Sequence, residues 1–138
     1  MQVQPYVFFE GRCEEAIAFY RDALGAEVQM MMRFKESPDQ SMVQPDAAEK
    51  IMHATLRIGD TQLLMSDGQC RGGGSAQFQG FALTISAVSD AEAERLFTAL
   101  AQGGQVGMPL QKTFFASSFG MVNDRFGVLW MVMAEAKA

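Results

Sequence analysis

The 138-residue sequence has little material for the commonest kinds of metal or catalytic centre. It contains one His and two Cys. This scarcity excludes a Cys/His zinc module, a disulfide framework and a Ser-His-Asp site with histidine to spare. The 16 acidic and 11 basic residues give a net charge of −5, which argues against a nucleic-acid partner. Phosphate backbones are bound by clustered Lys and Arg, and the sequence has no such cluster.

Signals for secretion and for membrane insertion are also missing. No apolar run approaches the ~18 residues of a membrane-spanning helix. Residues 1–5 have neither the charged nor the apolar region of a signal peptide. We therefore expect a cytoplasmic protein with no membrane partner. Cys13 and Cys70 are interpreted as inert thiols, because neither has a neighbouring His or basic cluster in the sequence that would stabilise a thiolate.

What the sequence does contain is a hydrophobic fraction of 49% and an excess of flexible and aromatic apolar residues, with 11 Met and 11 Phe. This length supports one domain with one core. Apolar periodicity and turn residues predict the same order of elements, strand, helix, strand, strand, strand, in both halves of the chain. In the first half we expect a helix over Cys13–Leu24, ended by Gly25, and strands over Val3–Phe9, Ala26–Phe34, Ile51–Ile58 and Thr61–Ser66. In the second half we expect a helix opened by a Ser89–Glu92 capping box and ended by Gly103-Gly104, and strands over Phe81–Val88, Val106–Met108, Phe114–Asn123 and Val128–Met133.

The repeat defines the predicted domain organisation. Residues 1–138 form a single domain, in which a first unit (1–71) and a second unit (76–138) are joined by the glycine-rich linker 72–75. The connection 35–50 is long and polar, which is typical of lids and mobile segments. The turn at Asp124–Gly127 is predicted to be a β-turn with glycine at the position of positive φ.

His53 is the strongest candidate for chemistry. Strand alternation places His53, Thr55 and Arg57 on one face of Ile51–Ile58 and the apolar residues on the other. His53 could act as a general base, or it could be a hydrogen-bonded residue that only organises the surface. Arg57 could bind an anionic group, or serve only as an exposed charge.

Weaker candidates are polar residues on neighbouring strands. Gln62 and Ser66 share a face with Leu64, and Ser117, Ser118 and Asn123 lie in the second unit, where turn formation explains them equally well. The consecutive Met30, Met31 and Met32, and the pair Met131 and Met133, could line an apolar binding surface or fill gaps in the core.

The order and spacing of short motifs resemble a known family. These motifs lie at residues 5–9, 13–20, 24–26, 50–54, 58–60, 64–67, 119–122 and 124–131. Together they resemble the vicinal oxygen chelate superfamily, which includes glyoxalase I, bleomycin-binding proteins and extradiol dioxygenases, and within it the PhnB-like branch. The sequence departs from that branch at Arg125, where Pro is usual, and at Phe115-Ala116, where Trp-Gly is common. A methyltransferase label carried by some relatives is given little mechanistic weight here, because no glycine-rich strand-to-helix turn for S-adenosylmethionine is present.

The resemblance implies an α+β fold in which two βαβββ units form a cupped mixed sheet with helices on the convex face. It also implies a homodimer. The metal ligands of catalytic members would fall on Pro5, Leu64, Phe81 and Met131. None of these side chains suits a hard divalent cation, since three have no donor atom and thioethers are soft ligands. We therefore expect no metal and no other cofactor.

Two functions remain open at this point. The first is a metal-free protein that binds a small apolar or aromatic molecule in the cup, with His53, Thr55, Arg57, Gln62, Phe81 and Met131 as ligand contacts. The second is an enzyme that uses His53 as acid and base on a small substrate, in lyase, transferase or dioxygenase-type chemistry. A scaffold with a vestigial cup is a third possibility.

Overall fold

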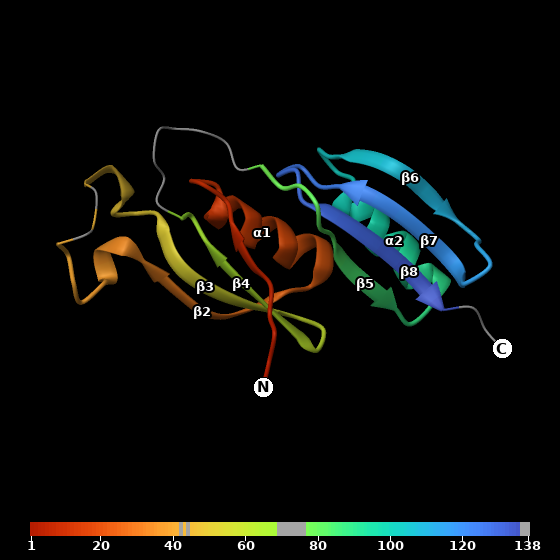
Figure 1. Cartoon of the computed structure of the whole chain (residues 1–138), viewed down its shortest axis with the longest axis horizontal. Coiled ribbons are helices and arrows are strands. Elements are labelled where there is room, and N and C mark those ends of the chain that lie inside the picture. Colours follow the sequence, from red (N-terminus) through yellow and green to blue (C-terminus); the bar gives the residue numbers. More distant parts are fainter. Residues whose placement is uncertain (42, 44, 69–76, 136–138) are drawn as a thin grey trace. The chain divides into compact units, whose positions relative to one another are not determined.

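The computed structural model describes residues 1–41, 43, 45–68 and 77–135. The chain divides into two compact units, Met1–Ala76 and Gln77–Ala138. Among these described residues, each unit has one four-stranded mixed sheet and one α-helix (Figure 1). This confirms the predicted α+β class and the repeated order of elements. The predicted linker 72–75 lies outside the described residues.

The first unit follows the predicted order closely. Its elements are β1 (Tyr6–Phe8), α1 (Cys13–Leu24), β2 (Glu27–Arg33), β3 (Ile51–Ile58) and β4 (Thr61–Ser66). The sheet order is β1-β4-β3-β2, with β1 parallel to β4 and the other pairs antiparallel. The predicted limits of α1, β3 and β4 are confirmed, and Gly25 ends α1 in the left-handed conformation. Strand β1 is shorter than the predicted Val3–Phe9, because its pairing with β4 begins only after Pro5, which has no N–H to donate.

The second unit repeats this arrangement. Its elements are β5 (Leu83–Ala87), α2 (Asp90–Leu100), β6 (Gln105–Gln111), β7 (Ala116–Asn123) and β8 (Leu129–Glu135). The sheet order is β5-β8-β7-β6, so each strand occupies the place of its counterpart in the first unit. Strands β7 and β8 cross in front of α2 in Figure 1. Neither helix of the described residues is long and apolar enough to cross a membrane.

The second unit differs from the prediction at several boundaries: β5 is shorter than the predicted Phe81–Val88, β6 is longer than Val106–Met108, and β8 extends two residues beyond Met133. Helix α2 ends at Leu100, and Gly103 belongs to the turn that follows it. Strand β7 begins at Ala116 rather than Phe114, because the Thr113 hydroxyl accepts the N–H groups of the next residues and closes a turn there. In the capping box, Ser89 Oγ accepts the Glu92 N–H as predicted, but the Glu92 carboxylate accepts the N–H of Val88 instead of that of Ser89.

Each helix covers one face of the sheet in its own unit. In the first unit, Ala54 and Leu56 of β3 are fully buried on the helix side, together with Met65 of β4. In the second unit, a Cβ at Gly120 of β7 would lie 2.7 Å from Phe97 of α2, so glycine allows the helix to sit close to the strand. The face of each sheet turned away from its helix is here called the open face of that unit.

A buried carboxylate holds the first unit together at the start of α1. Asp67, which is 1% exposed, accepts the backbone N–H groups of Gly11 and Cys13 at 2.9 and 2.7 Å through one oxygen. Its second oxygen accepts the N–H of Ile51 at 2.7 Å. The negative charge also faces the amino end of a helix, where it is electrostatically favoured. Asp67 therefore fixes where α1 and β3 begin.

Replacing this carboxylate should destabilise the protein strongly. We expect Asp67→Ala to lower the free energy of unfolding by about 3 kcal/mol or more, because hydrogen bonds to a charged group are lost and buried N–H groups are left without an acceptor. Asp22→Ala, at an exposed position of the same helix, should change it by less than about 0.5 kcal/mol. Urea denaturation measures both. Equal effects of the two substitutions would contradict the role given to Asp67.

Candidate functional site

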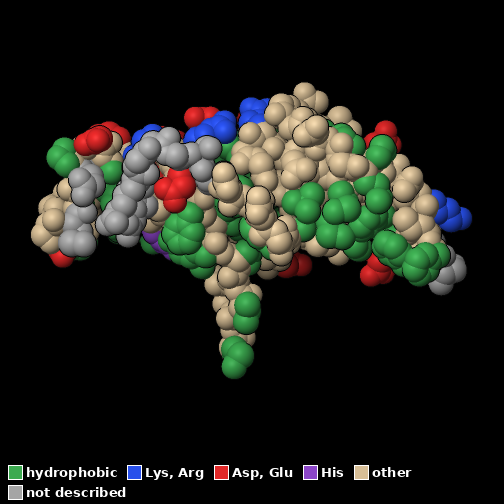
Figure 2. All heavy atoms as spheres, turned by 45° about the horizontal axis from the view of Figure 1, so that its top comes forward, with side chains coloured by type: hydrophobic (Ala, Val, Ile, Leu, Met, Phe, Trp, Pro, Cys, Tyr) green, Lys and Arg blue, Asp and Glu red, His purple; other side chains and the backbone are tan. Residues whose placement is uncertain are grey.

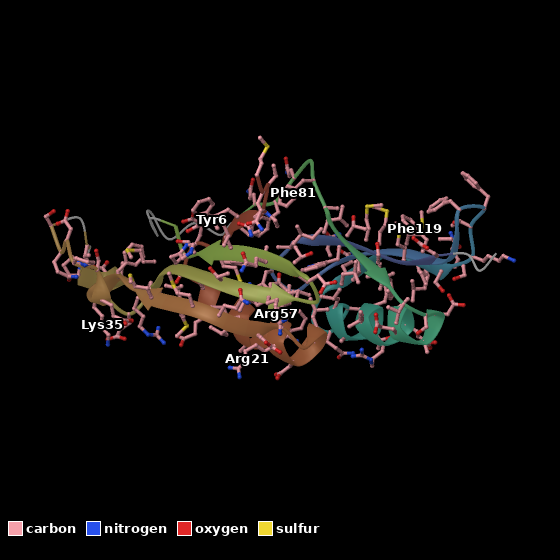
Figure 3. The ribbon with its side chains drawn as sticks, turned by 90° about the horizontal axis from the view of Figure 1, so that it is seen from below. Tyr6, Arg21, Lys35, Arg57, Phe81 and Phe119 are labelled. Atoms are coloured by element: carbon pink, nitrogen blue, oxygen red, sulfur yellow. The ribbon has the colours of Figure 1, made fainter. Side chains whose placement is uncertain are left out.

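The open face of the first unit carries both aromatic and polar side chains. Cross-strand register places Tyr6, Leu64, Thr55 and Met30 in one row across β1, β4, β3 and β2. Phe8 is paired with Ser66, and His53 is paired with Met32, on the same face. In Figure 3, Tyr6 lies on the side of the sheet opposite to α1 and its labelled Arg21. Strand alternation therefore separates these side chains from the helix-packed core.

His53 is held between two hydroxyl groups on this face. Its Nδ1 lies 2.9 Å from the Tyr6 hydroxyl and its Nε2 lies 3.4 Å from Thr55 Oγ1. The Tyr6 ring also stacks on Phe8, with 4.9 Å between ring centroids. Tyr6 is 40% exposed and Phe8 49% exposed. The structure thus brings His53 and Thr55 together, as predicted, and adds two accessible aromatic rings beside them.

Tyr6 is protonated at neutral pH, and the tautomer of His53 sets the direction of this hydrogen bond. Burial of the ring raises the pKa of Tyr6 above its usual value, and a hydrogen bond with Ser66 offsets part of this effect. The hydroxyl therefore keeps its proton at neutral pH and can donate it to His53 Nδ1. A neutral imidazole that accepts at Nδ1 carries its own proton on Nε2, where it faces Thr55.

The remaining predicted residues of the first unit form a polar border to the aromatic pair. Arg57 is on the predicted face, but its guanidinium is paired with Glu27 at 2.6 Å. Gln62 accepts from Gln4 at 2.6 Å and donates to Gln29 at 2.8 Å. These amides link the segment before β1 to the edge strand β2, across β4 and β3. Both residues thus have partners within the unit, and ligand contact by either one stays a prediction.

The weaker polar candidates serve local structure. Ser66 is buried, and its hydroxyl accepts the N–H of Gly68. Ser117 and Ser118 both donate to Asp90 Oδ1, at 2.6 and 2.8 Å, and so tie β7 to the start of α2. The β-turn at Asp124–Gly127 is confirmed, with Gly127 at φ 90°.

The positions corresponding to the superfamily's metal ligands do not fit a hard cation. Pro5 precedes β1 and offers only its carbonyl oxygen, which accepts the N–H of Leu64. Phe81 lies before β5, edge-on to Phe78, and Met131 lies in β8 between Thr84 and Met121. Within the part of the chain that the structure describes, no three His, Cys, Asp or Glu side chains gather where they could hold a metal ion. Ligand contact by Phe81 and Met131 stays a prediction.

The open face of the second unit is rich in methionine. Met121 of β7 is paired with Met131 of β8, and Met133 lies on the same face, paired with Phe119. We call Met121, Met131 and Met133 the methionine face. Hydrophobic side chains gather over the second unit in the right half of Figure 2. Sulfur atoms lie close to the labelled Phe119 in Figure 3, on the side of the sheet away from α2.

Tyr6 and Phe8 are the residues of the open face that sequence reasoning missed. Their strand was predicted, and its alternation separates them from the buried Val7 and Phe9. That signal was sufficient to put both rings on the open face. Their proximity to His53, 47 residues away in the sequence, depends on the parallel pairing of β1 with β4.

Comparison with known proteins agrees with this architecture. A family model of the glyoxalase/bleomycin resistance protein/dioxygenase superfamily matches residues 2–132. The protein YjdN of Escherichia coli is 38% identical over 142 residues, covering 96% of this chain and 94% of that protein. The solved structure of PA1353 from Pseudomonas aeruginosa is 43% identical with a TM-score of 0.86, covering 99% of both chains. A PhnB protein from Bacillus cereus shares the fold, with 24% identity, a TM-score of 0.78 and coverage of 97% of this chain and 99% of that one.

Two βαβββ units, each with one helix-covered and one open sheet face, define a protein of the glyoxalase fold. The chain belongs to the glyoxalase/bleomycin resistance protein/dioxygenase superfamily. A PhnB protein is among its structural neighbours.

The raised pKa of Tyr6 gives a pH dependence with a definite sign. The unfolded chain loses the phenolic proton near pH ~10, whereas the folded chain retains it to higher pH. Stability from this group is therefore complete below pH ~10 and is lost as the pH rises through the folded pKa. We expect the difference in unfolding free energy between wild type and Tyr6→Phe to shrink as the pH rises from about 8 to about 11. Urea denaturation at each pH measures it, and a constant difference would contradict the shift.

Proposed function

We propose that this protein binds a small aromatic or amphipathic molecule on the open face of the first unit, without the superfamily's metal. The observation that carries the proposal is the pair of accessible rings, Tyr6 and Phe8, placed directly beside the hydrogen-bonding groups of His53 and Thr55. Binding sites for small molecules commonly combine an apolar surface with a few polar groups that fix orientation.

The two kinds of side chain have different roles in this proposal. An aromatic ligand stacked on an exposed ring gains about 0.5–1.5 kcal/mol beyond the burial of its area. Met30 and Met32, paired with Thr55 and His53, extend the apolar surface with side chains that adapt to irregular shapes. The Tyr6–His53–Thr55 hydrogen bonds supply direction, because a ligand hydroxyl or carbonyl can compete for the imidazole or the phenol.

A simple aromatic alcohol tests the binding surface. We expect 2-naphthol to move the NMR signals of the Met30 and Met32 methyl groups and of the His53 ring. Tyr6→Ala should weaken its affinity about three- to tenfold, which corresponds to the loss of ~0.5–1.5 kcal/mol of stacking. EDTA should leave the affinity unchanged.

Phe114→Ala is the matched control for this titration, because Phe114 is 99% exposed in the second unit and lies outside the proposed surface. Equal losses in the two variants would reject the surface. Specific thermal stabilisation by one equivalent of Mn²⁺ or Zn²⁺ would reject the metal-free part, since binding to the native state alone raises apparent stability.

Acid–base catalysis by His53 is the second candidate function. It is favoured by the two hydroxyl partners, which hold the imidazole in one orientation on an accessible face. A ring held in this way can take a proton from a substrate once one partner is displaced. Lyase, transferase and dioxygenase-type reactions of small substrates are the classes that the superfamily suggests.

Exchange of carbon-bound protons distinguishes catalysis from binding alone. If His53 acts as a base, the protein should accelerate deuterium exchange next to the carbonyl of an aromatic ketone such as phenylacetone in D₂O. His53→Gln should reduce this acceleration about 100-fold or more, whereas Ser117→Ala, which alters a serine of the second unit, should not. If the exchange rate with the protein equals the rate in buffer, catalysis by His53 is rejected and binding remains the proposed function.

The proposed setting is a homodimer in the cytoplasm. The cytoplasmic setting rests on the sequence expectation; Cys13 is buried in the first unit, and Cys70 lies outside the described residues. The dimer rests on the family expectation alone, and light scattering of the purified protein would show a monomeric mass if it is wrong.

A further inference from the structure

The methionine face gathers three thioether side chains on one face of the second sheet. Met121 and Met131 are direct cross-strand partners, and Met133 follows on the same face of β8. All three side chains are half-buried. By contrast Met65, on the helix side of the first unit, is 0% exposed and is a true core residue. The three thioethers are therefore gathered at a surface that solvent reaches.

Sheet geometry allows the three sulfur atoms to converge. Cross-strand neighbours have Cβ atoms about 4.5–5.5 Å apart, and residues two apart on one strand are separated by about 6.6 Å. A methionine side chain has three rotatable bonds beyond Cα and can span either gap without moving the backbone. The cross-strand pairs Met121–Met131 and Phe119–Met133 place all three side chains on one face of the β7–β8 ladder.

The donor set selects one class of ligand. Thioether sulfur is a soft, neutral donor that binds Cu(I) and related soft cations and does not compete for Mg²⁺, Mn²⁺ or Zn²⁺. The neighbours in β5 that pair with Met131 and Met133 are Thr84 and Ser86, which bring hydroxyl groups but no negative charge. Phe119, paired with Met133, is buried and brings no charge to this face.

We propose that Met121, Met131 and Met133 form a thioether site for a soft monovalent cation of the Cu(I) class. The site is built entirely within the second unit and does not involve the Tyr6–His53 surface of the first. It takes one cation, held by sulfur atoms from two adjacent strands. Either site could exist without the other, so failure of one proposal leaves the other standing.

Silver(I) is the probe, because it has the same soft character and is stable in air. Thiols bind it more strongly than thioethers, so the titration uses the full chain with Cys13→Ala and Cys70→Ser, checked for native circular dichroism. In chloride-free buffer, the methyl signals of Met121, Met131 and Met133 should shift together and saturate at one equivalent of Ag⁺. Those of Met30, Met32 and Met65 should stay in place.

Substitution by leucine separates sulfur chemistry from apolar surface. Met131→Leu conserves volume and should lower Ag⁺ affinity at least about tenfold, the loss that removal of even an outer-shell partner of a metal site causes. Met30→Leu is the matched control in the first unit and should leave the affinity unchanged. Cu(I), kept reduced with ascorbate under argon, should shift the same three signals.

Three results would overturn the proposal. They are an absence of shifts up to millimolar Ag⁺, parallel shifts of methionines in both units, and an affinity that Met131→Leu does not change. Met133→Leu provides a second test if Met131→Leu fails to fold.

Discussion

The carboxylate of Asp67 ties together three separate segments of the first unit. Its oxygens accept N–H groups from the loop after β1, from the first residue of α1 and from the first residue of β3. Asp124 has a similar role in the second unit, where it accepts the backbone N–H of Val128 and the indole N–H of Trp130. Buried charges are tolerated only with such partners. Because Asp67 sets the start of β3, it also sets which residues of that strand reach the open face.

The division into a helix-covered and an open face gives each strand two chemical roles. On β3, Ala54 and Leu56 are buried on the side of α1, and His53 and Thr55 alternate with them on the other face. One helix can cover only one face of a sheet, so the polar and aromatic groups on the other face remain available. The two open faces differ in chemistry: the first offers hydrogen-bonding groups and aromatic rings, the second offers thioethers.

Much of the fold could be predicted because its signals are local. Helix α1 and strands β3 and β4 have the limits that apolar periodicity and the Gly25 and Gly59-Asp60 turns indicate. The second unit was predicted less well at its boundaries. Helix α2 ends three residues before Gly103. Strand β7 starts two residues after Phe114, because the Thr113 hydroxyl accepts the N–H groups of Phe115 and Ala116 and closes a turn there.

The sequence by itself determined the repeat, the family and the unsuitability of Pro5, Leu64, Phe81 and Met131 for a hard metal, since these follow from residue order and side-chain chemistry. Only the tertiary structure decided the partners of His53. Alternation puts His53 on a face, but contact with Tyr6 requires β1 to pair in parallel with β4 in one register, and a shift of one residue would put Tyr6 into the core. Long-range register is set by packing of the whole unit, which no local pattern contains.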